Sequence, residues 1–360
     1  MNLVTIVGAR PQFIKAGPVS AALATAGIHE RLLHTGQHYD DALSARFFTE
    51  LGLPAPAANL GVGSGPHGAQ TARMLTGIEE RLLDWRPDAV LVYGDTNSTL
   101  AGALAAAKLH LPVAHIEAGL RSRNRAMPEE INRLVTDHLS ARLYCPSAEA
   151  AANLADEGIT TGVHVVGDVM HDAVRHYRPL ALANSDILRR LHLEPRAYHV
   201  ATLHRAELTD HPALLATVLA TLSALPLPVV LPLHPRTRAR LESTGWHARS
   251  NSALRLLEPL GYLDMLALVA SSERVLTDSG GLQKEAYWLE RPCLTLRAET
   301  EWIETVSAGW NTLVPPASSG FDAALRIALA RPAPPLRPAL YGEGDAAPLI
   351  AADLARAFTP

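Results

Sequence analysis

The feature that most constrains the fold of this chain is a regular alternation between short apolar runs and longer stretches with helical periodicity. The short runs are rich in β-branched residues and apolar at nearly every position, which is typical of parallel strands covered by helices on both faces. We predict strands at residues 3–7, 30–34, 89–93, 113–116, 142–145, 163–166, 199–203, 229–233, 254–257, 274–276 and 292–296, with helices at 71–83, 97–109 and 212–225. This order predicts an α/β protein with doubly wound parallel sheets.

Two interruptions of the alternation indicate how the chain is divided. The alternation pauses between Met170 and Arg196, and a proline-rich stretch at 331–340, which cannot form a regular helix, precedes a last helical pattern. We therefore expect residues 1–172, joined by a C-terminal helix at 346–360, to form one Rossmann-like domain and residues 173–345 to form a second. Two such domains imply a cleft between them, and ligands of parallel sheets bind at the carboxyl ends of the strands.

The composition excludes several classes of function. A net charge of −4 provides no basic field for nucleic acid or for an anionic membrane, so an anionic ligand would need a local cluster of cations. The two cysteines, Cys145 and Cys293, cannot form a disulfide framework, which fits a reducing compartment. The chain has neither a signal-peptide pattern nor an apolar run approaching the ~20 residues of a membrane span. We expect a cytoplasmic protein.

Two cations follow the first predicted strand. Gly8 would permit a tight turn there, and Pro11 suits the first turn of a helix. Arg10 and Lys15 would then lie at a helix N-terminus, where the helix dipole already favours anions. Solvated cations on a loop are the plainer alternative, but two of them at the end of a strand favour a phosphate site.

Three acidic residues occupy similar positions in the first domain. Asp95 follows the strand at 89–93, where its alternative role is to cap the next helix. Glu117 follows an apolar strand, where an unpaired carboxylate is costly, and Glu129 lies in the first turn of a helix, where the dipole alone could explain it. Should the three converge, their pKa values would separate, as general acid/base catalysis requires.

Two further groups follow strands of the second domain. His204 and Arg205 come directly after the strand at 199–203. The run Ser279-Gly280-Gly281 follows the strand at 274–276 and offers backbone N–H groups and a hydroxyl to a pyrophosphate, while Glu285 could bind the hydroxyls of a ribose. The alternative is a tight turn with a serine cap. This run is not the G-x-S-x-G elbow of serine hydrolases, and no HExxH, Walker A or clustered CxxC motif predicts a metal or nucleotide triphosphate site.

Nine motifs occur in order between residues 8 and 311: GARPQFIK, TGQHYD, YGDTNST, HIEAGLRS, MPEEINR, TLHRAE, HPRT, TDSGGLQKEA and ETEWIETVSAGWN. Together they resemble the non-hydrolysing UDP-N-acetylglucosamine 2-epimerases. The resemblance implies a glycosyltransferase-B-type fold of two Rossmann-like domains with an interdomain cleft. It also implies a homodimer that interconverts UDP-N-acetylglucosamine (UDP-GlcNAc) and UDP-N-acetylmannosamine (UDP-ManNAc), with no nicotinamide cofactor and no obligatory metal.

The resemblance assigns roles at matching positions. The catalytic residues it implies are Asp95, Glu117, Glu129 and His204. The residues it implies for binding the UDP group are Arg10, Lys15, Arg205, Ser279, Gly280 and Gly281 at the diphosphate and Glu285 at the ribose.

Several positions depart from the commoner family pattern. Gln12 stands where glutamate is more usual, residues 299–304 read ETEWIE rather than TTERPE, and Arg123 replaces a bulky apolar residue. The stretch 37–40 also differs from the version tied to allosteric activation. The first two variants resemble a subgroup that includes UDP-2,3-diacetamido-2,3-dideoxy-glucuronate 2-epimerases, so that sugar is the alternative substrate. A hydrolysing epimerase is a further alternative. So are a UDP-sugar glycosyltransferase, which would need an acceptor and one base, and a nucleotide-sugar sensor, which would need no acids.

Overall fold

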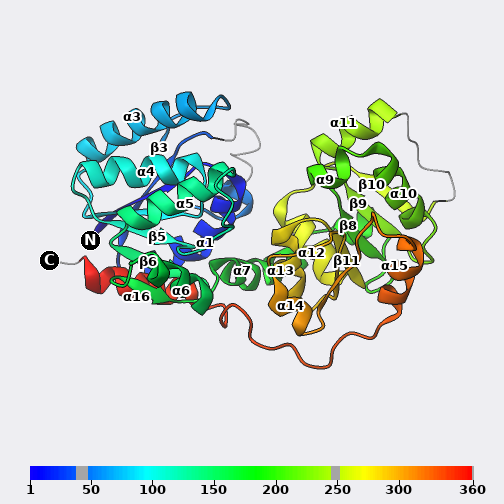
Figure 1. The fold of residues 1–360 in the computed structure, drawn as a ribbon. Helices are drawn as coiled ribbons and strands as arrows, with labels where there is room; N and C mark the ends of the chain where they lie inside the picture. The colour runs from blue at the N-terminus through cyan, green and yellow to red at the C-terminus, as the bar shows by residue number, and fades with distance from the viewer. Residues whose placement is uncertain (38–47, 245–251, 359–360) are drawn as a thin grey trace. The chain divides into compact units, whose positions relative to one another are not determined.

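The computed structural model describes residues 1–37, 48–244 and 252–358, so residues 38–40 of the variant stretch lie outside the described part (Figure 1). The chain divides into two compact units. Unit 1 comprises Met1–His176 and Tyr341–Pro360, and unit 2 comprises Tyr177–Leu340. Among the described residues, no helix combines the length and apolar character needed to cross a bilayer.

Unit 1 contains a parallel seven-stranded sheet in the order β3-β2-β1-β4-β5-β6-β7. Its strands are β1 (Asn2–Val7), β2 (His29–His34), β3 (Ala58–Asn59), β4 (Ala89–Tyr93), β5 (Val113–Ile116), β6 (Arg142–Cys145) and β7 (Val163–Val165). The chain moves outward from β1 in both directions, so the sheet is doubly wound.

Helices cover both faces of this sheet. They are α1 (Arg10–Thr25), α3 (His67–Trp85), α4 (Asn97–Lys108), α5 (Pro128–Leu139), α6 (Ala148–Asp156) and the C-terminal α16 (Ala346–Ala357). Helix α7 (Val169–Asn184) begins in unit 1 and ends in unit 2. Helix α4 packs between α3 and α5, while α16 packs on α1, so the end of the chain completes unit 1 (Figure 1). The strands in the middle are apolar on both sides: successive residues such as Val90 and Leu91, which face opposite sides of the sheet, are both fully buried.

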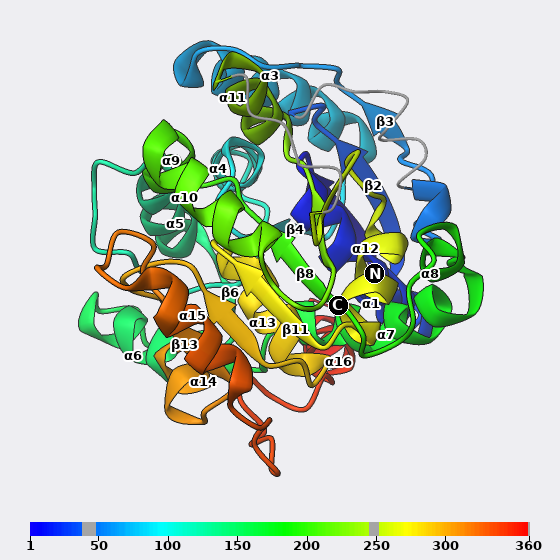
Figure 2. The ribbon, with the colours of Figure 1, turned by 90° about the vertical axis from the view of Figure 1, so that its right-hand side faces the viewer.

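Unit 2 repeats the arrangement with six parallel strands in the order β10-β9-β8-β11-β12-β13. The strands are β8 (His199–Thr202), β9 (Val229–Pro232), β10 (Leu254–Leu257), β11 (Arg274–Thr277), β12 (Cys293–Thr295) and β13 (Asn311–Leu313). The helices are α8 (Ile187–Arg190), α9 (Ala206–Thr209), α10 (Pro212–Ser223), α11 (Pro235–Thr244), α12 (Tyr262–Ser271), α13 (Gly280–Trp288), α14 (Ile303–Ser307) and α15 (Phe321–Ala330). Strands β8 and β11 lie side by side in the middle of the sheet (Figure 2).

The predicted α/β fold with doubly wound parallel sheets is confirmed, and every predicted strand is present within one or two residues. Strands β3 and β13 were not predicted, because runs of two and three residues carry too little pattern. The predicted pause after Met170 contains helix α7, whose apolar periodicity is obscured by its arginines and by Pro179.

The expected role of Gly8 needs correction. Its backbone is not left-handed. A Cβ atom at this position would lie 2.1 Å from the hydroxyl of Thr35 and 2.2 Å from that of Ser98. The glycine is therefore required by close packing, and not by the dihedral angle of a tight turn.

Candidate active site

The turn between β4 and α4, which carries Asp95, is held by side chains from three different elements. The Tyr93 carbonyl accepts a hydrogen bond from the Thr99 hydroxyl of α4 (2.6 Å). In addition, three consecutive backbone carbonyls each accept one hydrogen bond from another element. The donors are Gln12 Nε2 to Tyr93 (2.8 Å), His115 Nε2 to Gly94 (2.8 Å) and Asn132 Nδ2 to Asp95 (2.8 Å). Because the donors come from α1, β5 and α5, the position of this turn depends on the whole carboxyl edge of the unit 1 sheet.

Gln12 is a departure from the family pattern that the geometry explains. Its side-chain oxygen accepts from the N–H groups of Gly8 (2.8 Å) and Ala9 (3.1 Å), while its nitrogen donates to the Tyr93 carbonyl. An ionised glutamate could accept both N–H groups but could not donate to that carbonyl.

The carboxylate of Asp95 does not cap α4. Thr96 does so, since its hydroxyl accepts from the backbone N–H of Thr99. Asp95 is instead 32% exposed, and one of its oxygens lies 2.6 Å from Nη2 and 3.0 Å from Nε of Arg133. The capping alternative for Asp95 is therefore wrong, and its carboxylate is paired with Arg133 instead.

Glu117 follows β5 with a backbone φ of +70°, a left-handed conformation that is uncommon for a residue with a side chain. Its carboxylate forms an ion pair with the ammonium of Lys15, and the two side chains are only 10% and 14% exposed. Burial opposes the charge on Lys15. Nevertheless, the carboxylates of Glu117, Asp168 and Asp95 together raise the pKa of Lys15 above its ordinary value. Lys15 is therefore charged, and it links Glu117 electrostatically to Asp95.

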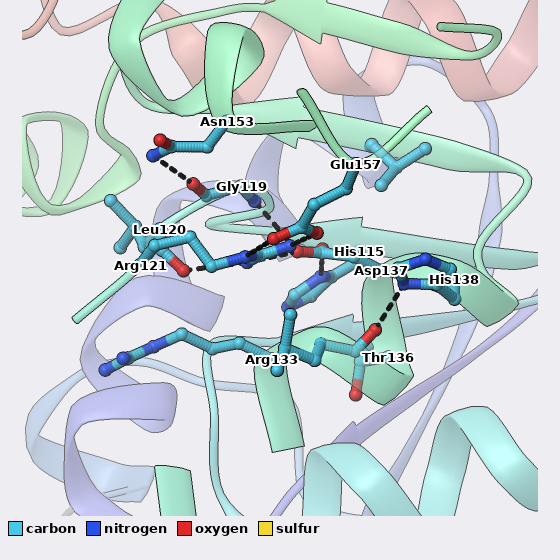
Figure 3. A network of polar contacts seen from close by, with 12 residues as sticks. His115, Gly119, Leu120, Arg121, Arg133, Thr136, Asp137, His138, Asn153 and Glu157 are labelled. Atoms are coloured by element: carbon cyan, nitrogen blue, oxygen red, sulfur yellow. Dashed lines mark hydrogen bonds and ion pairs between the residues drawn. The ribbon is translucent and has the colours of Figure 1, made fainter. Parts of the chain in front are cut away.

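A buried polar network supports this edge from behind (Figure 3). One oxygen of Asp137 lies 2.7 Å from Nδ1 of His115, and the other lies 2.7 Å from Nη1 of Arg121 and accepts the N–H of Gly119 at 3.1 Å. Arg121 also donates to both oxygens of Glu157. His115 and Asp137 are completely buried. Burial opposes ionisation of Asp137, but its cationic partners outweigh that effect and hold its pKa below the ordinary range.

Of the two acids in the first turn of α5, only one has a structural role. Glu130 is buried and accepts hydrogen bonds from the N–H groups of Ser122 (2.9 Å) and Arg123 (2.8 Å) and from Arg133 (2.9 Å). Glu129 is exposed. No hydrogen bond or ion pair joins it to Asp95 or Glu117 among the residues described. The convergence of Glu129 with the other two acids stays a prediction.

In unit 2, the buried carboxylate of Asp278 positions the loop that follows β8. One of its oxygens accepts the backbone N–H groups of His204 (2.8 Å) and Arg205 (2.9 Å), and the other lies 3.0 Å from Nδ1 of His204. The imidazole of His204 remains 37% exposed. Asp278 therefore orients a histidine whose ring is still accessible to a ligand.

The N-terminus of α13 has the features of an anion site. Ser279 is the N-cap and accepts from Leu282, as its alternative role predicted, while Gly280 and Gly281 form the first turn. Nη2 of Arg205 would lie 3.8 Å from a Cβ added at Gly280, so its guanidinium is beside this turn. These N–H groups and this cation suit a phosphate group.

The variant segment 299–304 lies against the same turn. Trp302 donates its indole N–H to the carbonyl of Gly280 (2.8 Å), and Glu301 lies 3.5 Å from Arg205. Glu301 is also paired in parallel with Arg297 at 2.9 and 3.0 Å. Trp302 and Glu301 of this segment thus contact Gly280 and Arg205, two residues that the sequence predicts to bind a diphosphate.

The two remaining predicted residues differ in their surroundings. Arg10 is the first residue of α1 and is exposed. Glu285 lies one turn into α13, where burial raises its pKa to about 7 and Lys284 only partly opposes that shift. Burial, followed by the charge of Glu285, in turn raises the pKa of Tyr262.

The sequence analysis missed four residues that position the site: Gln12, Arg133, Asp137 and Asp278. A histidine in an apolar strand, such as His115, was a usable signal for a buried partner. Asp137, an acid on a helix, gave no such signal, since most acids on helices are solvated. Within the described ranges, no three His, Cys, Asp or Glu residues gather closely enough to hold a metal ion.

Comparisons with known proteins agree on one family. Residues 21–355 match the family described as UDP-N-acetylglucosamine 2-epimerase. A Methanococcus maripaludis protein named UDP-N-acetylglucosamine 2-epimerase homolog is 50% identical over 87% of this chain and 88% of its own length. The UDP-2,3-diacetamido-2,3-dideoxy-D-glucuronate 2-epimerase of Pseudomonas aeruginosa is 46% identical over 99% of this chain and 100% of its own.

Solved structures agree as well. The UDP-GlcNAc 2-epimerase of Methanocaldococcus jannaschii, solved in complex with UDP-GlcNAc and UDP, superposes with a TM-score of 0.86 at 40% identity, covering 99% of this chain and 100% of that one. The glycosyltransferase VinC, at 17% identity and a TM-score of 0.53 over 99% of this chain and 96% of its own, shares the fold alone. The glycosyltransferase-B-type fold is thereby confirmed.

We expect Asp137→Asn to destabilise the protein by about 1.5–3 kcal/mol, because it removes one of the two carboxylates that compensate the buried Arg121, while Glu157 remains. Urea unfolding would measure this change. The control is Asp322→Asn, which breaks an exposed pair with Arg326 on α15 and should cost less than about 1 kcal/mol. Equal effects in the two variants would contradict the proposed importance of the network.

We expect the melting temperature of the wild type to fall relative to Glu285→Gln as pH rises from about 5 to 7. The reason is that folding raises the pKa of Glu285 from an ordinary 4.5 to about 7, so the folded chain keeps a proton that the unfolded chain loses in this range. Above pH 7 the difference should level off. Glu299→Gln, an exposed control, should give a difference independent of pH; parallel curves for both variants would refute the shift.

Proposed function

This chain belongs to the UDP-N-acetylglucosamine 2-epimerase family, an isomerase family, and from that premise we propose that it interconverts UDP-GlcNAc and UDP-ManNAc by inverting C2. The observation that carries the proposal is the buried Glu117–Lys15 pair, electrostatically coupled to Asp95 at the carboxyl edge of the unit 1 sheet. It supplies a carboxylate in a fixed position with a charged ammonium beside it.

The chemistry of C2 explains why such a group is needed. The C2 proton is not adjacent to a carbonyl, so its direct removal would leave an unstabilised carbanion. Elimination avoids this. The bond between C1 and the diphosphate oxygen breaks, its electron pair leaves with UDP, and a carboxylate takes the proton from C2 while the C1–C2 double bond of 2-acetamidoglucal forms. Re-addition of UDP to C1 then accompanies delivery of a proton to C2 from the opposite face. The route is redox-neutral and calls for no nicotinamide.

Two faces of one carbon require two groups that handle protons. We assign these roles to Glu117 and Asp95, with Glu129 as a third candidate. Lys15 and Arg133, their cationic partners, keep the acids of unit 1 in place.

The nucleotide is assigned to unit 2. Its diphosphate is proposed to meet the N–H groups of Gly280 and Gly281, the hydroxyl of Ser279 and the guanidinium of Arg205, which stabilise the departing charge. Glu285 is proposed to bind the ribose. His204, oriented by Asp278, is assigned to the reaction as well, and Arg10 of unit 1 to the diphosphate.

One observation favours a second candidate substrate. The Pseudomonas aeruginosa diacetamido-glucuronate epimerase matches this chain over nearly its full length, and the variant residues Glu301 and Trp302 lie at the start of α13. UDP-2,3-diacetamido-2,3-dideoxy-glucuronate is therefore the alternative substrate, for the same elimination chemistry.

We further propose a cytoplasmic homodimer. The face of α5 carries Met127, Ile131 and Val135 at helical spacing, exposed by 37%, 42% and 37%, and an apolar stripe of this kind is typical of a surface covered by a partner. Sedimentation velocity at micromolar concentration would detect the dimer; a monomer mass would contradict it.

If elimination and re-addition occur, deuterium from heavy water must appear at C2 of the sugar. The measurement is NMR of UDP-GlcNAc, and separately of the diacetamido-glucuronate sugar, incubated with the enzyme and no acceptor. Product that keeps its original hydrogen at C2 would exclude the mechanism. Free N-acetylmannosamine would indicate the hydrolysing alternative, and no reaction with either sugar would exclude an epimerase.

Glu117→Gln should lower turnover by about 10²–10⁴-fold and leave UDP affinity near that of the wild type, because an amide keeps the shape but cannot shuttle a proton. The measurements are kcat, UDP affinity and melting temperature on one preparation. Glu80→Gln, an exposed acid on α3, serves as control. If turnover per folded molecule is retained and only the melting temperature falls, Glu117 has a structural role alone.

A further inference from the structure

A cavity of about 420 Å³ lies in unit 2 at the amino ends of three strands. Arg274 begins β11, Cys293 begins β12 and Asn311 begins β13, and all three line it together with the end of α15. The residues assigned to the nucleotide follow the carboxyl ends of β8 and β11. The cavity is therefore at the opposite edge of the same sheet.

The cavity contains a buried guanidinium that is incompletely satisfied. Arg274 is 6% exposed, its Nε has no hydrogen-bond partner, and one Nη donates to the carbonyl of Arg331. Among the described residues, no carboxylate forms an ion pair with it; Glu273, next in the chain, acts on it only through space. An uncompensated buried cation is costly, so an anion bound beside Arg274 would offset that cost.

A second buried base, which carries no charge at physiological pH, lies beside Arg274 at this edge. His199 pairs with Arg274 in the sheet register, is 5% exposed, and has no hydrogen-bond partner at Nδ1. Burial, followed by the charge of Arg274, lowers the pKa of His199 to about 4, so the ring is neutral at physiological pH. The pair thus consists of one fixed cation and one neutral ring, with no acid to compensate the charge.

The rest of the lining sets the size and character of a ligand. Val306, Trp310 and Leu313 supply apolar surface, and Arg331 lines the cavity near the end of α15. The volume falls in the range of ~300–1,000 Å³ that is usual for small-molecule sites. The thiol of Cys293 is not a reactive group here, because burial raises its pKa to about 12.

We propose that this cavity binds a small organic anion whose carboxylate or phosphate group accepts hydrogen bonds from Arg274 and whose apolar body contacts Val306, Trp310 and Leu313. A guanidinium recognises both kinds of anionic group through charge-assisted hydrogen bonds. The site is separate from the proposed epimerase chemistry and does not depend on it.

The test is calorimetric titration of the full-length protein with benzoate and with inorganic phosphate, each with and without UDP. We expect one of the two probes to bind with a stoichiometry of one, equally well in both conditions; which one binds distinguishes a carboxylate from a phosphate ligand. Arg274→Met should weaken binding by about tenfold or more. Ala328→Leu, which fills the cavity and keeps Arg274, should also weaken it. Arg326→Met, the same charge change at an exposed position of α15, should not.

Several results would overturn the proposal. For the wild type, these are the absence of binding of either probe at about 10 mM and competition of the probe with UDP. For the variants, they are equal weakening of binding by Arg274→Met and Arg326→Met and unchanged binding in Ala328→Leu. Ala328→Leu keeps the test decisive if Arg274→Met does not fold. Epimerase turnover should be unchanged in Arg274→Met. Failure of this proposal and failure of the epimerase assignment therefore give different results.

Discussion

The turn after β4 depends on hydrogen bonds to three successive carbonyls, and much of unit 1 is organised around them. Gln12, His115 and Asn132 each hold one carbonyl, and His115 is itself held by the buried Asp137. A backbone carbonyl left without a donor in a buried turn would cost free energy comparable to a lost hydrogen bond. Asp95 is therefore placed by its neighbours, and its own side chain remains partly exposed beside Arg133.

Both units use a buried carboxylate to place residues at the edge of a sheet. In unit 1, Asp137 accepts the N–H of Gly119 and pairs with His115; in unit 2, Asp278 accepts two N–H groups and pairs with His204. The difference lies in exposure, since His115 is completely buried whereas His204 is accessible. The same arrangement thus supports a loop in one unit and presents a ring to ligand in the other.

The buried cations of this protein differ in whether a carboxylate compensates their charge. Arg121 and Lys15 are compensated by carboxylates, which keeps them in place without a ligand. Arg274 lacks such a partner, although it is equally buried. Because a low dielectric makes unpaired charge expensive, these two situations have different consequences: the first stabilises the fold, and the second favours binding of an anion.

The sequence by itself determined every strand but β3 and β13, the presence of two parallel sheets, and the loops that carry Asp95, Glu117, His204 and Ser279, because hydrophobic periodicity is a local property. It did not determine which charged side chains pair with one another. Lys15 and Glu117 are 102 residues apart, and Asp278 and His204 are 74 apart, so only the strand order brings each pair together. The tertiary structure likewise decided that Lys15, expected at a diphosphate, pairs with an acid, and that Arg274 lines a cavity. Contacts of this kind depend on which strands are neighbours, and no local pattern of residues encodes that information.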